Sequence, residues 1–189
     1  DFIFNLMQRL NLTNQTAVLG NGAGGFMAVS LAIKYGNNFD KLILADTGSG
    51  FPEEGKGPLK LLAKRVEEEG MIGVLDAAMA RMFPESFINE NPEIIAIRKK
   101  ALSQCNPQAF AATARALSNV DMSSEISRIN NSTLIMVGLE DKTTPPEMSY
   151  SLHEGINGAS LVTIPHCGHC PQIQSSSIFI NEIKSFLIS

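Results

Sequence analysis

A glycine-rich turn between two apolar runs constrains the fold of this chain more than any other feature. Residues 20–25 read GNGAGG, with a short apolar run at 16–19 before them and a longer one at 26–35 after them. Glycine clusters of this kind mark tight turns, and a longer apolar run after such a turn is typical of a buried helix. The segment therefore predicts a strand, a sharp turn and a helix in immediate succession.

This succession is the setting of the nucleophile elbow, G-x-S-x-G, in which a serine is presented on a strained turn. The chain carries Gly22 where the motif has its serine, between Gly20 and Gly24. Glycine has no side chain and cannot attack a substrate. Ser30 and Ser49 are the nearby serines, and neither lies on an elbow. We therefore predict the scaffold of a covalent hydrolase without its nucleophile.

The rest of the chain alternates buried strands with helices, which predicts a parallel sheet in an α/β layer fold. Strands are expected at 16–20, 41–46, 132–137 and 160–164. Helices are expected at 2–11, 23–35, 145–155 and 175–187, with a loop at 47–57. Between 58 and 120 the pattern is helical throughout, at 58–69, 71–82, 92–104 and 107–119, which predicts an all-helical insert.

Three candidate catalytic positions follow predicted strands, at the sheet edge where α/β proteins place their ligands. They are Gly22 in the turn, Asp141 after the third strand and His169 after the fourth. The chain order nucleophile, acid, histidine is that of the α/β-hydrolases. In such a site the acid orients the imidazole, which moves the proton of the nucleophile.

Several motifs together resemble the α/β-hydrolase family, in the group that includes the 3-oxoadipate enol-lactonases. The segment VLGNGAGGFMAVSLAIKY is similar to the family's VLGHSMGGxxAxxLAxxY, and ARMF at 80–83 is similar to the lid motif ARWF. The segments KLILADTG, VGLEDKTTPPEM and IPHCGHCPQIQ match the family's next strand, its acid segment and its histidine segment. The resemblance runs over the whole chain, in family order.

The resemblance implies an N-terminally truncated hydrolase core at 1–50 and 123–189, with a helical lid at 51–122. It makes Asp141 the triad acid and His169 the base, and it implies that the Ala23 N–H group donates a hydrogen bond to the oxyanion. It also implies that Asn21, Arg81 and Met82 bind the substrate, with Arg81 contacting a substrate carboxylate. An apolar lid would suit a small, partly apolar substrate; its apolar residues are Met79, Met82, Phe83 and Phe87.

The implied function is hydrolysis of a small carboxylic ester or enol-lactone, impaired or inactive for want of the nucleophile. Two departures support the impairment: Gly22 replaces the serine, and Asn21 replaces the histidine beside it. The family's first four strands, which precede the elbow and carry a second oxyanion donor, are also absent, which predicts a fragment. The alternative is a non-catalytic ligand-binding or interaction module. A redox or zinc role for Cys167 and Cys170 is a third, less favoured alternative.

Composition narrows the expected partners. A net charge of −4 without a basic patch excludes nucleic acid as an expected partner, and no apolar run approaches the ~20 residues of a membrane span. Three cysteines indicate a reducing, cytoplasmic location, and no cofactor or metal is expected. With strands missing on one side, residues 16–19 would form an exposed apolar edge, which predicts a homodimer or other oligomer through that edge.

Overall fold

The computed structural model describes residues 1–12 and 15–188 and is built around a parallel sheet. Its four strands lie in the order β1-β2-β3-β4, and every neighbouring pair is parallel. They are β1 (Ala17–Asn21), β2 (Lys41–Ala45), β3 (Ser132–Gly138) and β4 (Ser160–Ile164). The predicted α/β fold with a parallel sheet is confirmed, and each predicted strand lies within one residue of an observed one.

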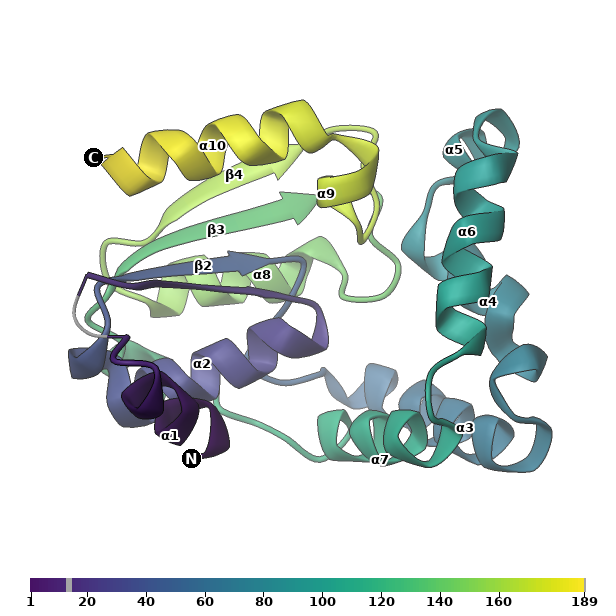
Figure 1. The fold of residues 1–189 in the computed structure, drawn as a ribbon, viewed down its shortest axis with the longest axis horizontal. Coiled ribbons are helices and arrows are strands. Elements are labelled where there is room, and N and C mark those ends of the chain that lie inside the picture. The colour runs from purple at the N-terminus through teal and green to yellow at the C-terminus, as the bar shows by residue number, and fades with distance from the viewer. Residues whose placement is uncertain (13–14, 189) are drawn as a thin grey trace.

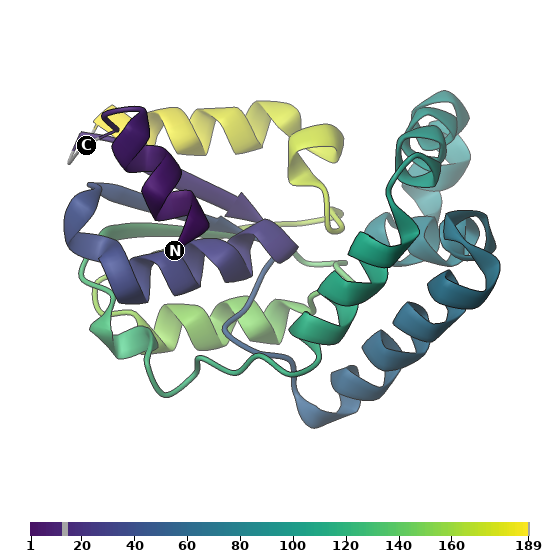
Figure 2. The ribbon, with the colours of Figure 1, turned by 60° about the horizontal axis from the view of Figure 1, so that its bottom comes forward.

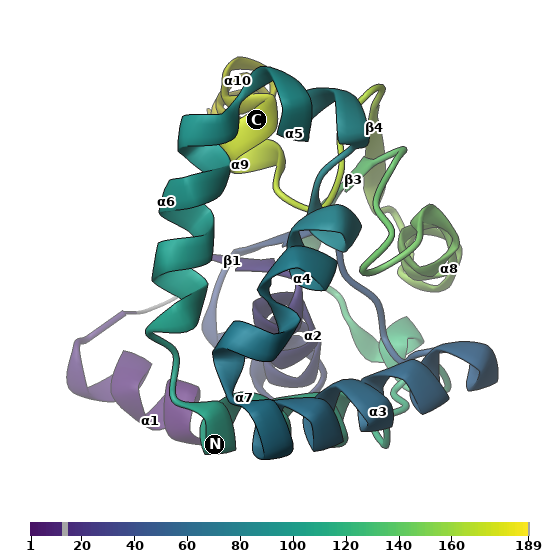
Figure 3. The same cartoon turned by 90° about the vertical axis from the view of Figure 1, so that its right-hand side faces the viewer.

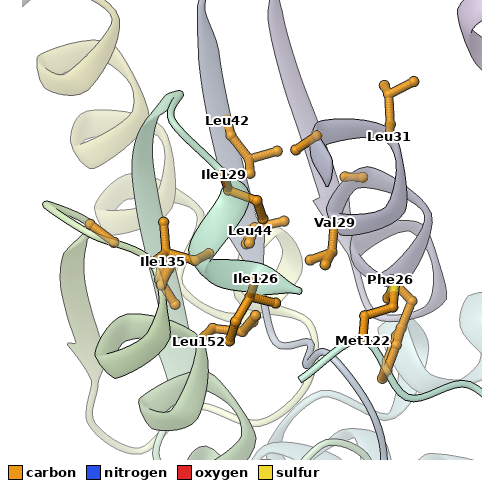
Figure 4. Packing of buried hydrophobic residues seen from close by; sticks show 14 of the residues in the cluster. Phe26, Val29, Leu31, Leu42, Leu44, Met122, Ile126, Ile129, Ile135 and Leu152 are labelled. Carbon is orange, nitrogen blue, oxygen red and sulfur yellow. The ribbon is translucent and has the colours of Figure 1, made fainter. Parts of the chain in front are cut away.

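Helices cover both faces of the sheet. In Figure 1, α2 (Ala23–Tyr35) and α8 (Pro146–Gly155) lie on one face and α10 (Ser176–Ile188) on the other. The two-residue period of a strand explains this division in β2, because Leu42 and Leu44 face α2 and α8 while Ile43 faces α10. Figure 4 shows the first of these cores, where Leu42 and Leu44 meet Val29 of α2.

The N-terminal helix, α1 (Phe2–Arg9), packs on α2 and crosses it in Figure 2. The ring of Phe4 stacks on the ring of Tyr35, with 4.0 Å between their centroids, and Met7 is buried. The helix predicted at 2–11 is therefore present and ends two residues earlier. None of the helices in the described residues is long and apolar enough to cross a membrane.

The segment between β2 and β3 forms a separate group of helices. They are α3 (Glu53–Glu69), α4 (Leu75–Met82), α5 (Glu85–Glu90), α6 (Pro92–Ser103) and α7 (Pro107–Leu117). The segment enters and leaves at one point, where Met122 N donates to Ser49 O at 2.8 Å. The strands in Figure 1 point toward this group, and Figure 3 shows α4 and α6 in front of their carboxyl ends. We call this group the helical insert.

Two parts of the insert differ from the sequence prediction. Helix α3 begins at Glu53, inside the predicted loop, and runs through Pro58. Glu53 and Glu54 lie in its first turn, where carboxylates favour a helix N-terminus, and this offsets the poor helix propensity of the glycines that follow. Helix α5 was not predicted, because six residues are too few for a periodic pattern. The remaining short elements are η1 (Gly36–Asn38), η2 (Met71–Val74), η3 (Ile126–Arg128) and α9 (Pro171–Gln174).

Candidate active site

The turn around Gly22 joins β1 directly to α2. Strand β1 ends at Asn21 and helix α2 begins at Ala23, so Gly22 alone makes the turn, with φ 54° and ψ −124°. This conformation is costly for a residue with a side chain and nearly free for glycine. At Gly20 a Cβ atom would lie 2.5 Å from the carbonyl oxygen of Gly24, so the turn also needs glycine there.

Position 22 faces the imidazole of His169. A Cβ atom added to Gly22 would lie 2.8 Å from His169 Nε2 and 3.2 Å from Cε1. The backbone of the turn therefore directs any side chain at this position onto the ring nitrogen that a base would use. The distance is also shorter than an ordinary contact to a Cβ atom, so the ring occupies part of the space that a side chain would need.

His169 forms a buried pair with Asp141. The Nδ1 atom of His169 lies 2.8 Å from Asp141 Oδ2, and the side chains are 10% and 0% exposed. With a carboxylate acceptor at this distance, Nδ1 carries the proton and Nε2 is left as the basic nitrogen. Nε2 makes no hydrogen bond to any residue that the structure describes. The pair has the arrangement of an acid that orients a general base.

The loop after β3 holds the Asp141 carboxylate with several donors. The backbone N–H groups of Thr143 and Thr144 donate to Oδ1, at 2.7 and 3.1 Å. The Thr144 hydroxyl lies 2.8 Å from Oδ2 and 3.2 Å from His169 Nδ1. These donors satisfy the oxygens of the buried carboxylate, because each replaces a hydrogen bond to solvent.

The three predicted substrate-binding residues all bind the framework of the site. Arg81 donates from Nε to Lys142 O at 3.3 Å and from Nη2 to Thr143 O at 3.5 Å. Met82 O accepts the His169 backbone N–H at 2.8 Å. Asn21 Nδ2 donates to His169 O at 3.3 Å and to the backbone of β2. A contact of any of the three with a substrate stays a prediction.

Ala23 is placed to serve an oxyanion. It is the first residue of α2, and its N–H group donates to no atom of the described residues. A free N–H at a helix N-terminus is a donor aligned with the helix dipole, which favours negative charge. The geometry agrees with the predicted oxyanion role of Ala23, which stays a prediction.

Sequence reasoning missed Asp46, the residue that follows β2. Its side chain is fully buried, it has φ 47°, and its Oδ1 accepts the Gly138 N–H at 2.8 Å. Burial, with a smaller contribution from the charge of Asp141, raises the pKa of Asp46 to about 7. The one sequence signal was a carboxylic acid directly after a strand of apolar residues.

Cys167 and Cys170 are buried in two different clusters, and Cys105 is exposed. Cys167 belongs to the core under α10, and Cys170 packs with Met79 and Phe83 of the insert. Burial raises the pKa of Cys167 to about 11 and that of Cys170 to about 12, so neither forms a thiolate readily. This argues against a redox role. Met79 and Phe83, two of the apolar residues predicted for a lid, are buried in this cluster, and their contact with a substrate stays a prediction.

The sequence matches the model of the alpha/beta hydrolase family over residues 5–180. Among curated proteins, the 3-oxoadipate enol-lactonase 2 of Acinetobacter baylyi is 24% identical over 173 residues. That alignment covers 92% of this chain and 64% of the relative, so the chain spans less than two thirds of its length. A 2-hydroxy-6-oxo-6-phenylhexa-2,4-dienoate hydrolase of Comamonas testosteroni is 28% identical, with 96% of this chain and 65% of the relative covered.

Solved structures agree on the fold. The enol-lactonase of Burkholderia xenovorans superposes with a TM-score of 0.89 at 22% identity, covering 99% of this chain and 70% of that one. An esterase of Thermogutta terrifontis superposes with a TM-score of 0.86 at 28% identity, covering 96% and 68%. The described residues therefore share the alpha/beta hydrolase fold of these structures.

Proposed function

The chain belongs to the alpha/beta hydrolase family, and from this premise we propose that its site takes small carboxylic esters or enol-lactones without forming a covalent intermediate. One observation carries the proposal: position 22 points at His169 Nε2 with 2.8 Å from a Cβ atom to the nitrogen, yet holds no nucleophile. The substrate class follows the relatives, which include an enol-lactonase and an esterase.

In this proposal His169 acts on water instead of on a serine. Asp141 holds the Nδ1–H tautomer, so Nε2 can accept a proton from a water that approaches the carbonyl carbon. The N–H of Ala23 would stabilise the oxyanion that develops. A hydrolase site stripped of one triad member keeps roughly 10³–10⁴-fold catalysis over water, which bounds the expected rate. The activity should therefore be weak.

The roles of Asn21, Arg81 and Met82 belong to the same proposal. Arg81 is already engaged by two backbone carbonyls beside Asp141, while its Nη1 has no partner among the described residues. We assign Arg81 the double task of holding the acid loop and meeting a substrate carboxylate with its remaining donors. Asn21 and Met82 would line the site through the histidine loop that they hold.

A kinetic experiment on three proteins tests this function. The natural chain should hydrolyse p-nitrophenyl acetate or an enol-lactone slowly and without a burst, since no acyl-enzyme can form at Gly22. His169→Ala should abolish that activity, whereas His153→Ala, at an exposed histidine of α8, should leave it unchanged. Weak hydrolysis that survives His169→Ala would contradict the proposal, and so would a burst.

A second candidate is a non-catalytic ligand-binding or interaction module on the same fold. Gly22 is the observation that favours it, because loss of the nucleophile leaves binding groups without chemistry. Titration calorimetry with the ester or lactone separates the two. Binding without any turnover above the His169→Ala protein supports the module, whereas turnover that depends on His169 supports the hydrolase.

A further inference from the structure

Asp46 presents a buried oxygen that lacks a hydrogen-bond partner. Its Oδ1 accepts the Gly138 N–H, and its backbone N–H donates to Met136 O at 2.9 Å, so the carboxyl is fixed at the end of β2. Oδ2 is buried and makes no hydrogen bond within the described part of the chain. A carboxylate in this state would carry an uncompensated charge, whereas a protonated carboxyl would carry a donor.

Burial, the largest effect, and the negative charge of Asp141 favour the protonated form of Asp46, whereas the Gly138 N–H group and His169 oppose it. The Thr144 hydroxyl places the two acids close together, because it lies 2.7 Å from Asp46 O and 2.8 Å from Asp141 Oδ2. Cys167 and Cys170 are the other titratable groups that sense it, and both are thiols held neutral by burial. No lysine or arginine is among the groups that act on Asp46 in the described residues. Two adjoining buried carboxyls cannot both be ionised cheaply.

The donors decide which of the two carboxyls holds the charge. Asp141 receives two backbone N–H groups, the imidazole N–H of His169 and a share of the Thr144 hydroxyl. That hydroxyl has one proton and also lies 2.7 Å from the backbone oxygen of Asp46, so it cannot serve both acceptors at once. Asp46 receives one donor. The negative charge therefore belongs on Asp141 and the proton on Asp46.

We propose that Asp46 is a positioning residue that is a neutral carboxylic acid below neutral pH and donates its Oδ2 proton to the Asp141 carboxylate. This hydrogen bond gives Asp46 Oδ2 a partner, and it gives the Asp141 carboxylate one more donor that holds it toward His169. Ionisation of Asp46 would place a second negative charge beside the pair and favour protonated His169, which cannot accept a proton. The effect of Asp46 on catalysis rests on the proposed roles of Asp141 and His169. The presence of the proton on Asp46 does not depend on those roles.

Carbon NMR of the aspartate carboxyl groups tests where the proton resides. The Asp46 resonance, assigned by its loss in Asp46→Asn, should titrate near neutral pH. In Asp46→Asn, whose amide can still donate to Asp141, the Nδ1 proton that His169 shares with Asp141 should persist. An Asp46 carboxyl that is already ionised in mildly acid solution would overturn the proposal.

Stability as a function of pH gives a second readout that needs no turnover. The folded state binds the Asp46 proton more tightly than the unfolded state, because the pKa is raised to about 7 from 3.8. Its contribution is full below the unfolded pKa and is lost as pH rises through the folded pKa. The unfolding midpoint should fall as the pH rises from about 4 to about 7, between the unfolded and the folded pKa of Asp46, and this fall should be smaller in Asp46→Asn.

A matched control separates this effect from a general change of charge. Asp40 lies at the opposite end of β2 and is exposed, so Asp40→Asn removes the same charge without touching the site. Asp40→Asn should keep the natural pH dependence. Equal pH dependence in the natural chain and in Asp46→Asn would overturn the proposal. Absence of ester turnover would count against the proposed function and leave these measurements standing.

Discussion

Gly22 combines a backbone conformation and a close contact that both disfavour a side chain. A residue other than glycine at φ 54° and ψ −124° costs roughly 1 to 3 kcal/mol, and its Cβ atom would lie 2.8 Å from His169 Nε2. We expect Gly22→Ser to lower the unfolding free energy or leave it unchanged. Its esterase rate should rise only if the His169 ring withdraws and a second oxyanion donor is present. Chemical denaturation with a parallel ester assay measures both.

Gly24 provides the control for this change at a distance of two residues. A Cβ atom there would meet nothing within 4 Å, and the residue lies inside α2. Gly24→Ala should therefore be neutral or stabilising, since alanine favours a helix over glycine by about 1 kcal/mol. A Gly22→Ser protein that is clearly more stable than the natural chain would contradict the assignment of the elbow.

Individual residues differed in how far the sequence could place them. Asp141 and His169 each follow a strand of a parallel sheet. Because the carboxyl ends of parallel strands lie at the same edge, the sequence could predict that these two residues are near each other. Asp46 follows a strand as well, but its partner is set by side-chain direction and by φ 47°, which no pattern encodes. Burial decides its protonation, and burial of a single strand-end residue is a property of the assembled fold.

Helix α4 is tied to both loops of the candidate site. Arg81 donates to two carbonyl oxygens of the acid loop, and Met82 O holds the backbone of His169. We expect Arg81→Met, which keeps the length and removes the donors, to raise amide hydrogen exchange in 139–145 and to weaken any His169-dependent hydrolysis. Mass spectrometry of exchanged peptides would detect the change in the loop.

The control for Arg81→Met is an arginine whose partner is a side chain on the protein surface. Arg65 pairs with Glu69 on the exposed surface of α3, so Arg65→Met should leave the acid loop unchanged. Equal exchange in both variants would show that Arg81 does not hold the loop. The ARMF segment that contains Arg81 could be recognised from sequence. This contact could not, because it joins segments about sixty residues apart in a geometry that only packing fixes.

At the scale of the whole molecule, the sheet was predictable and its exposed edge was expected from the resemblance. Apolar strands alternating with helices predict parallel pairing, and the observed register joins each strand to the next along the chain. The sequence predicts less well which face of the sheet each helix covers. It depends on the handedness of each connection and on where the helical insert leaves the sheet.

Strand β1 supports the last prediction, which concerns assembly. In the described residues β1 pairs with β2 alone, and Leu19 remains 47% exposed although α1 packs nearby on α2. An exposed apolar strand edge is a template for pairing with another chain. We therefore propose that these 189 residues self-associate through β1, as a two-fold dimer or as larger aggregates. Sedimentation velocity at micromolar concentration measures the outcome.

Leu19→Lys places a charge on this edge and should shift the chain toward the monomer, whereas Met27→Lys, at a side chain 51% exposed on α2, should not. A natural chain that stays a stable monomer would contradict this prediction and indicate that α1 protects the edge.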